Sequence, residues 1–171
     1  MSATEPRLRF VTGDVTDLEG SPRSPGAVFI CHIANDVGKW GKGFTGALDA
    51  RWGQPRMDYM DLWHRQQGRG RIPRGSALVS TVSKAPDAYV YTMVTQAGVG
   101  RGQDRVDYVE LERCLAGLRA QVLPNDEVRM PRIGVGLAGG NWGIISQIIR
   151  QTLCENGVPV TVYDLPTLPE G

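Results

Sequence analysis

The sequence predicts an α/β domain of three layers, in which helices cover both faces of a sheet of about six strands. Short segments rich in β-branched and aromatic residues are bounded by Gly, Pro, Asp or Asn, as strands are. Between them lie segments whose apolar residues recur every three or four positions, as on helices that bury one face. Strands that alternate with helices in a chain of 171 residues indicate one layered domain.

Six segments are expected to be strands, and one of them is expected to be central. Residues 27–34 read AVFICHIA, an almost continuous apolar run that suits a strand covered on both faces. His32, inside this run, is expected to be a hydrogen-bonded core histidine rather than a catalytic base. The expected strands are Leu8–Thr12, Ala27–Ala34, Ala77–Val82, Tyr89–Thr95, Glu127–Met130 and Pro159–Tyr163.

Four helices are expected between the strands, each marked by an apolar stripe. The first ends at Gly53 and Pro55, the third at Pro124-Asn125 and the fourth at Asn156-Gly157, residue types that are common after helices. The stripes are Phe44, Leu48 and Trp52; Tyr59, Leu62 and Trp63; Tyr108, Leu111, Leu115, Leu118 and Val122; and Trp142, Ile145, Ile148, Ile149 and Leu153.

Composition and charge disfavour several classes of protein. Hydrophobic residues at 41% and charged residues at 22% fit a globular domain, not a disordered tail. The 19 Lys and Arg against 18 Asp and Glu leave a net charge of +1, so charge does not require a nucleic-acid partner. The basic cluster of Arg65, Arg69, Arg71 and Arg74 is expected to be a solvated loop.

The three cysteines, Cys31, Cys114 and Cys154, are far apart and form no C-x-x-C motif, so neither a disulfide framework nor a metal site is expected. No apolar run reaches the length of a membrane span, and the first seven residues are no signal peptide. We expect a cytoplasmic monomer with reduced thiols, no cofactor and no membrane partner. Its single domain is expected to fill 1–171, with a core at about 8–165 and loose tails at 1–6 and 166–171.

Twelve of the 22 glycines fall in three short windows, at 38–46, 98–102 and 134–143. Glycine allows several backbone N–H groups to converge on one anion, above all where a helix begins. The third window contains G-x-G-x-x-G between an expected strand and helix, with Asn141 as a candidate N-cap. Only 31 residues follow Gly140, too few for the rest of a dinucleotide-binding domain, so an oxidoreductase is disfavoured. A tight turn needed only for packing is the alternative interpretation.

The first window follows Asn35 and Asp36, at the carboxyl end of the expected central strand. Ligands of open α/β sheets gather at that edge, so two glycine loops there are suited to gripping opposite sides of one phosphorylated ligand. Trp40 is either a cover over this ligand or a local packing contact. The window 98–102 is either a gate of the site or a simple connection.

Four motifs, in this order and spacing, resemble those of one family. They are Gly13-Asp14-Val15-Thr16, ICHIANDVGKWGKGF at 30–44, MPRIGVGLAGGNW at 130–142 and VTVYDL at 160–165. They are similar to the macrodomain family, which binds ADP-ribose, and most closely to its branch of terminal ADP-ribose protein glycohydrolases and yeast-type ADP-ribose 1''-phosphate phosphatases. The resemblance covers about residues 8–165. It implies a three-layer α-β-α sandwich with a mixed, about six-stranded central sheet.

The resemblance also implies roles for individual residues. Asp14 and Val15 correspond to the family's adenine contact, Tyr163 to a residue against the adenine ring, and Asn35 to the asparagine beside the distal ribose. Ordinary turn or core roles are the alternatives at these positions. Backbone N–H groups of the two glycine loops would hold the diphosphate and the distal ribose. The implied ligand-binding residues are Asp14, Val15, Asn35, Gly41, Lys42, Gly43, Gln96, Gly134, Val135, Gly136, Leu137, Ala138 and Tyr163.

Catalysis is less determined, because the chain departs from one relative. In the terminal ADP-ribose protein glycohydrolase, a lysine after the fourth strand and an aspartate in the diphosphate loop act together, whereas this chain has 95–98 (TQAG) and Ala138 there. Asn35 and Asp36 are therefore the candidate catalytic residues, which would orient a water against C1'' of the distal ribose. One expected function is a hydrolase that removes mono-ADP-ribose from acidic side chains, or processes a related ester or 1''-phosphate. The other is a non-catalytic reader of ADP-ribose. The partner would be ADP-ribose or an ADP-ribosylated protein or small molecule.

Overall fold

A mixed sheet of six strands forms the centre of the fold. The computed structural model describes residues 7–19, 26–66 and 68–166, so the expected tails lie outside these ranges apart from residue 166. The strands are β1 (Leu8–Thr12), β2 (Val28–Asn35), β3 (Ala77–Lys84), β4 (Asp87–Gln96), β5 (Glu127–Met130) and β6 (Val160–Asp164). Their order is β1-β6-β5-β2-β4-β3, and every neighbouring pair is parallel except β3 with β4. The six expected strands and the mixed sheet are confirmed.

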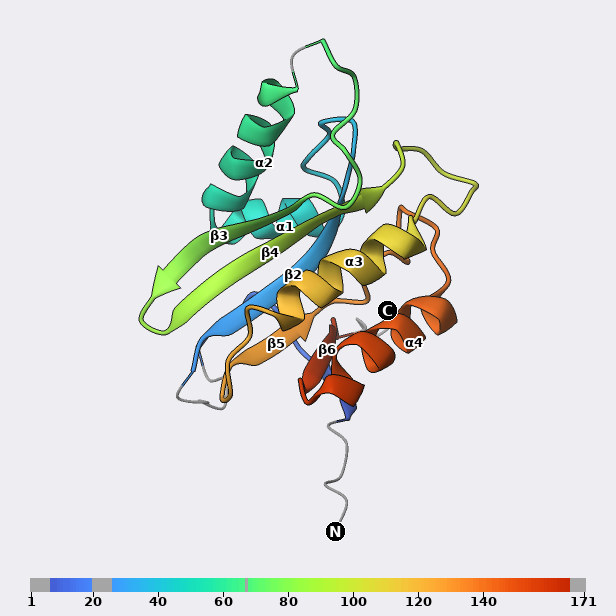
Figure 1. The fold of residues 1–171 in the computed structure, drawn as a ribbon. Helices are drawn as coiled ribbons and strands as arrows, with labels where there is room; N and C mark the ends of the chain where they lie inside the picture. Colours follow the sequence, from blue (N-terminus) through green and yellow to red (C-terminus); the bar gives the residue numbers. More distant parts are fainter. Residues whose placement is uncertain (1–6, 20–25, 67, 167–171) are drawn as a thin grey trace, which may run out of the picture.

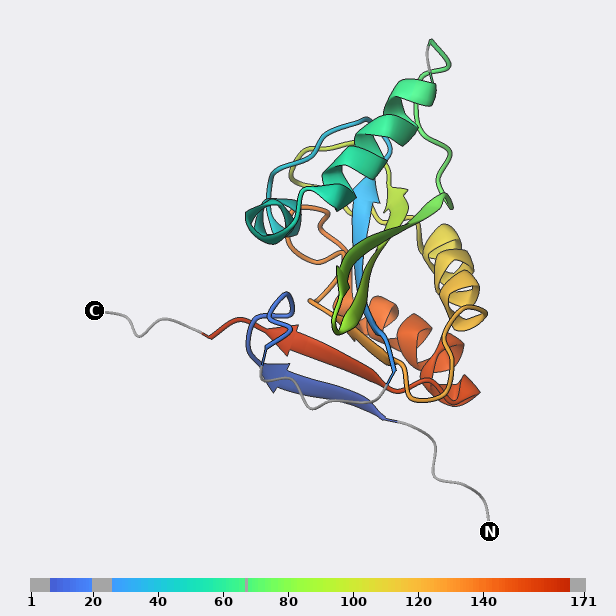
Figure 2. The ribbon, with the colours of Figure 1, turned by 90° about the vertical axis from the view of Figure 1, so that its left-hand side faces the viewer.

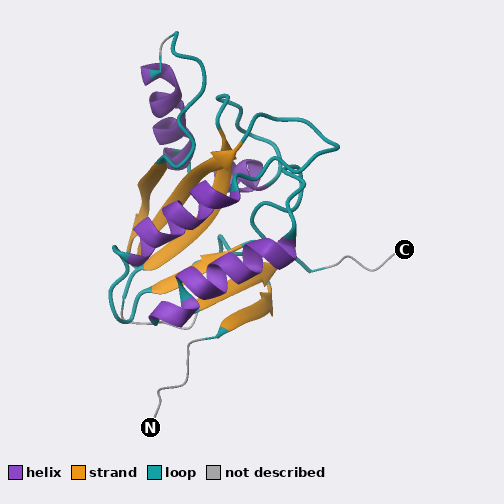
Figure 3. Cartoon of the chain, turned by 45° about the vertical axis from the view of Figure 1, so that its right-hand side comes forward, coloured by secondary structure: helices purple, strands orange, loops and turns teal. Residues whose placement is uncertain are grey.

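Helices cover both faces of this sheet, as expected. The helices are α1 (Phe44–Arg51), α2 (Gln54–Arg65), α3 (Tyr108–Arg119), α4 (Trp142–Thr152) and the short η1 (Cys154–Asn156). Figure 2 shows α1 and α2 on one side of the sheet and α3 and α4 on the other. In Figure 3, α3 and α4 run along one face of the strands. None of the helices in the described part of the chain is long and apolar enough to cross a membrane.

Strand β2 explains the three layers most directly. It pairs with β5 on one side and β4 on the other, and its side chains alternate between two cores. Phe29 and Cys31 join the core beneath α3 and α4, whereas Val28 and Ile30 join the core beneath α1. The continuous apolar run in the sequence is therefore the pattern of a strand covered on both faces, as predicted.

The start of α4 agrees with the sequence, whereas α3 and α4 end at Arg119 and Thr152, four or five residues before the expected breaks. Asn141 caps α4, since its side chain accepts a hydrogen bond from the Ile144 N–H at 3.2 Å, and Asp107 caps α3 in the same way. Pro55 does follow α1, as expected, but it also lies in the first turn of α2. A proline is tolerated there because the first N–H groups of a helix have no partner within it.

The parallel strands place three loops at one end of the sheet. Because β5, β2 and β4 are neighbours that run in the same direction, the loops that follow them leave at the same edge. These are the loops at 36–43, 97–107 and 131–141, which lie close together in Figures 1 and 2. Each contains one of the three glycine windows or most of it.

All three cysteines lie in the interior. Cys31, Cys114 and Cys154 have exposed fractions of 0%, 3% and 1%. Burial raises the pKa of the Cys31 thiol far above its usual range and that of Cys114 to about 11. The thiols of Cys31 and Cys114 therefore stay protonated, and all three cysteine side chains belong to the core beneath α3 and α4.

Candidate functional site

The three loops enclose a cavity of about 780 Å³ at the carboxyl ends of β2, β4 and β5. This volume lies in the range of small-molecule sites, about 300–1,000 Å³. Of the residues predicted to bind ligand, it brings together Asn35, Lys42, Gly43, Gln96, Gly134, Gly136, Leu137 and Ala138. Gly41 and Val135 lie in the same loops but do not line the cavity. The structure thus joins residues up to about a hundred positions apart along the chain.

The charge of the cavity is one-sided. Lys39, Lys42, Arg101 and Arg132 line it, whereas no aspartate or glutamate is among the described lining residues. Arg132 forms an ion pair with Asp164, but the other three cations form none with any carboxylate of the described part of the chain. A nearly neutral protein therefore has a cavity that attracts anions.

The loop at 131–141 is held in shape by its own backbone. The Gly140 N–H donates to the Gly134 carbonyl at 2.7 Å, which turns the chain into the start of α4. At Gly139 the backbone has φ +68°, and a Cβ built there would lie 2.6 Å from the carbonyl oxygen of Gln103. Glycine is therefore required at Gly139 both for its left-handed conformation and for the close approach of the neighbouring loop.

The loop at 97–107 also belongs to the site, a role that the sequence left open. Val99, Gly100 and Arg101 line the cavity. The Arg105 side chain donates to the Gly100 and Ala97 carbonyls, at 3.0 and 3.2 Å, and so closes the loop on itself. The glycines of this window were the available signal in the sequence, but glycine content alone does not separate a cavity wall from a connection.

Asn35 stabilises the loop that follows β2, which is the turn role given above as the alternative to a ribose contact. Its side-chain oxygen accepts from the Val37 and Lys39 N–H groups and the Tyr59 hydroxyl, and its amide donates to the Lys39 carbonyl at 2.7 Å. The residue is 9% exposed and lines the cavity. The second hydrogen of its amide makes no hydrogen bond with the described residues. Asn35 can therefore hold the loop and still donate this hydrogen to a ribose hydroxyl.

Asp36 lies behind the wall of the cavity rather than in it. The residue is completely buried and is not among the lining residues. Its carboxylate is occupied by the Gly98 N–H at 2.8 Å and by Arg74 at 3.0 Å. The hypothesis that Asp36 orients a water molecule is therefore not supported, because both carboxylate oxygens are turned to protein groups.

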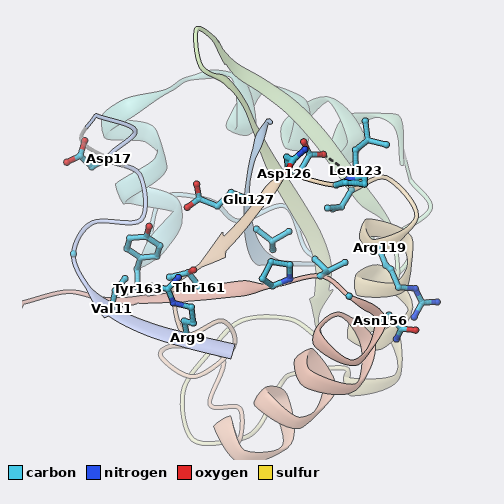
Figure 4. Close-up of a pocket in the computed structure, with 18 of the residues that line it drawn as sticks. Arg9, Val11, Asp17, Arg119, Leu123, Asp126, Glu127, Asn156, Thr161 and Tyr163 are labelled. Atoms are coloured by element: carbon cyan, nitrogen blue, oxygen red, sulfur yellow. Dashed lines mark hydrogen bonds between the residues drawn. The ribbon is translucent and has the colours of Figure 1, made fainter. Parts of the chain in front are cut away.

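The residues predicted to hold adenine lie elsewhere. Asp14 and Tyr163 line a second cavity, of about 930 Å³, beside β1 and β6 (Figure 4). The face of the Tyr163 ring carries the buried guanidinium of Arg129 at 5.1 Å from the ring centre, and Val15 is 4% exposed. Burial opposes ionisation of Asp14, but hydrogen bonds from Thr16 and Arg51 outweigh it and lower its pKa. These residues stay predictions, since none lines the first cavity.

Two aromatic side chains that line the cavity, His32 and Trp40, have packing roles. His32 lines the cavity but is 1% exposed, and its Nε2 lies 2.8 Å from the Thr92 hydroxyl. Burial lowers the pKa of His32 to about 4, so the ring is neutral at pH 7, in agreement with its expected core role. Trp40 donates from Nε1 to Asp49 at 2.9 Å and stacks on Tyr59, so it is fixed as a packing contact at the rim.

Two further aromatic rings pack against Arg132, which also lines the cavity. The guanidinium lies 5.0 Å from the centre of the Phe10 ring and 5.1 Å from that of the Trp142 ring. Two hydrogen bonds, at 2.7 and 3.0 Å, join it to Asp164. Sequence reasoning missed Arg132, because its partners come from β1, β6 and α4 and no local pattern unites them.

Comparison with known proteins finds a family model and several relatives that agree with the resemblance in the sequence. A family model described as Macro domain matches residues 31–149. The chain is 24% identical over 161 residues to the human ADP-ribose glycohydrolase OARD1, covering 93% of this chain and 92% of that protein. It is 26% identical to the mouse chromodomain-helicase-DNA-binding protein 1-like and 31% identical to an uncharacterized Thermotoga maritima protein. It spans only 18% and 24% of the length of these two proteins.

Solved structures share the fold over nearly the whole chain. A Bacteroides thetaiotaomicron protein of unknown function is 34% identical, with a TM-score of 0.79, over 94% of this chain and 99% of that one. A macrodomain protein from Streptomyces coelicolor is 33% identical, with a TM-score of 0.73, over 92% and 99%. An Oceanobacillus iheyensis macrodomain solved with ADP, at 19% identity and a TM-score of 0.67 over 98% and 87%, agrees in fold.

Proposed function

The chain belongs to the macrodomain family, and on this premise we propose that its 780 Å³ cavity binds ADP-ribose and that the protein hydrolyses ADP-ribose conjugates. One observation carries the binding part of the proposal, namely that three glycine-containing loops enclose a cavity lined by cations and by no described carboxylate. A diphosphate suits such a site, because backbone N–H groups and lysine or arginine side chains both favour anions. The name of the human relative, an ADP-ribose glycohydrolase, agrees with the proposal.

The proposed reaction is the removal of mono-ADP-ribose from acidic side chains, or the cleavage of a related ADP-ribose ester or 1''-phosphate. A carboxylate is a good leaving group at C1'' of the ribose, so a positioned water and electrostatic stabilisation are sufficient chemistry. In this chain the cations Lys42 and Arg101 would stabilise the leaving anion. Asn35 is the remaining candidate for orienting the water, since Asp36 is enclosed by other groups.

A non-catalytic reader is the second candidate, and a specific observation favours it. No carboxylate lines the cavity in the described part of the chain, so no acidic general base stands ready beside a bound ribose. Cytoplasmic location and a monomeric state remain predictions of the sequence.

Calorimetric titration with ADP-ribose tests the binding step. We expect a dissociation constant in the micromolar range or below for the wild-type protein. Gly136→Ala tests the site directly. A Cβ at this position meets no protein atom within 4 Å, so the fold is not disturbed, but it would occupy space in the cavity. We expect Gly136→Ala to fold normally and lose most of its affinity. Gly53→Ala is the matched control, since its Cβ also meets no atom within 4 Å and Gly53 does not line the cavity.

Release assays separate the two candidate functions. Wild-type protein that binds ADP-ribose and liberates it from glutamate-linked, serine-linked or 1''-phosphorylated substrates is a hydrolase, and protein that binds without releasing it is a reader. Failure of the wild-type protein to bind at micromolar concentrations would exclude both.

A further inference from the structure

Asp36 is a charged side chain with no exposure to solvent that joins three separate segments of the chain. Its carboxylate accepts a hydrogen bond from the Gly98 N–H at 2.8 Å. It also forms ion pairs with Arg74 at 3.0 Å and Arg71 at 3.5 Å, both from the connection between α2 and β3. A carboxylate is removed from water only where cations and N–H donors replace the water, which is the case here.

Arg74 extends this contact to the start of α3. Its Nε donates to Asp107 at 2.8 Å, and Asp107 is the residue that caps α3. We call Asp36, Arg71, Arg74 and Asp107 the charge clamp. Its two arginines belong to the basic cluster that the sequence predicted to be a solvated loop. Arg65 of the same cluster pairs with Asp61, so three of the four arginines have a carboxylate partner.

The charge clamp holds the loop whose residues form one wall of the cavity. Gly98, which Asp36 binds, directly precedes Val99, Gly100 and Arg101, and these three line the cavity. At its other end the same loop is joined to the diphosphate loop of the proposed site, because the Arg105 N–H donates to the Ala138 carbonyl at 2.9 Å. The loop is therefore fixed between the charge clamp and the loop at 131–141.

We propose that Asp36 is a positioning residue of the ligand site, which sets the loop at 97–105 against the cavity and places Arg101 at its edge. Asp36 itself touches no ligand, because it is fully buried and does not line the cavity. It acts through Gly98. This inference rests on the proposed function, in that the ligand whose binding it controls is ADP-ribose.

Asp36→Asn is the test, because the neutral amide has nearly the same volume, weakens the hydrogen bond from the Gly98 N–H and removes the charge that holds the two arginines. We measure hydrogen exchange of the backbone amides and the affinity for ADP-ribose, both well below the unfolding temperature. We expect faster exchange across 97–103 and an affinity about ten-fold lower, the size of effect produced by losing one charge-assisted hydrogen bond. A purely structural role would lower the unfolding temperature without either change.

Asp61→Asn is the matched control, because Asp61 pairs with Arg65 on the exposed surface of α2 and does not line the cavity. It should change neither exchange at 97–103 nor affinity by more than about two-fold, as surface ion pairs contribute little. If Asp36→Asn fails to fold, Arg74→Gln replaces it, since this side chain is 37% exposed and its removal breaks the same clamp.

The outcomes separate cleanly. Loss of loop protection together with loss of affinity supports the proposal. Unchanged exchange, or faster exchange with unchanged affinity, overturns it while ADP-ribose binding by the wild-type protein stands. If the wild-type protein does not bind ADP-ribose, the proposed function fails, and exchange at Gly98 alone then decides whether the charge clamp holds the loop.

Discussion

Replacing Gly139 by alanine tests how tightly the two loops of the site pack on each other. Gly139 has φ +68°, and a left-handed conformation costs an alanine about 1–2 kcal/mol. The new Cβ would also lie 2.6 Å from the Gln103 carbonyl oxygen, a backbone atom that cannot rotate away. Overpacking of this kind typically costs about 1–3 kcal/mol. We therefore expect the free energy of unfolding of Gly139→Ala to fall by roughly 2–5 kcal/mol.

Gly157→Ala separates the two causes, because Gly157 has φ +87° and no atom within 4 Å of its Cβ position. It should show the conformational cost alone. Thermal unfolding is the assay, and for a domain of this size each kcal/mol lowers the midpoint by about 2–4 °C. Equal midpoints for Gly139→Ala and Gly157→Ala would refute the reasoning, since they would mean that the loop at 97–107 moves away from the new Cβ at no cost in free energy.

Three further predictions concern the cap, the aromatic cluster and the buried histidine. Asn141→Ala removes the N-cap of α4 and should cost about 1 kcal/mol in denaturant unfolding. In the wild-type protein, hydrogen bonds from Arg132 lower the pKa of Asp164. The stabilisation from this pair is therefore fully present above the ordinary aspartate pKa of about 3.9 and is lost as pH falls through the lowered value. Arg132→Ala removes the pair. The difference in melting temperature between wild type and Arg132→Ala should therefore be larger at pH 7 than at pH 3. Burial lowers the pKa of His32 to about 4, so the unfolded chain takes up this proton first and stability should decline as pH falls from about 6.5 towards 4.

Each of these has its own control. Asn141→Asp keeps a capping oxygen and should retain the stability of the wild type, whereas equal losses for the alanine and aspartate variants would exclude a capping role. A pH-independent effect of Arg132→Ala would assign its whole contribution to contacts with the Phe10 and Trp142 rings. For His32, NMR titration should find a neutral ring down to about pH 5. A midpoint above pH 6 would contradict the argument.

The strands and helices could be predicted because their signals are local. Leu8–Thr12 and Glu127–Met130 have the predicted bounds, since Gly13 and Pro131, residue types that end strands, follow them directly. The Asn141 cap is likewise visible within four residues of sequence. Turns closed by an asparagine side chain are local too. The hydrogen bonds that Asn35 accepts from the Val37 and Lys39 N–H groups form such a turn, which was the alternative to a ligand contact at this position.

The partners of buried charges could not be predicted. Asp36 meets Gly98, 62 positions away, and Arg129 donates to the carbonyl of Asp17, 112 positions away. Such pairs depend on strand order, which brings β5, β2 and β4 together and which no local pattern encodes. The sequence analysis chose Asp36 as a catalytic candidate because it follows the central strand. Its burial depends on partners from distant segments, and these could not be seen in the sequence.

The burial of the three native thiols makes the protein suited to single-site labelling. Cys31, Cys114 and Cys154 are at most 3% exposed, so thiol reagents would react slowly with the native chain. Val99 lines the cavity and is 46% exposed, so a cysteine introduced there would present an accessible sulfur at the edge of the site. An environment-sensitive dye at that position would report occupancy of the cavity in the folded protein without removing any native cysteine.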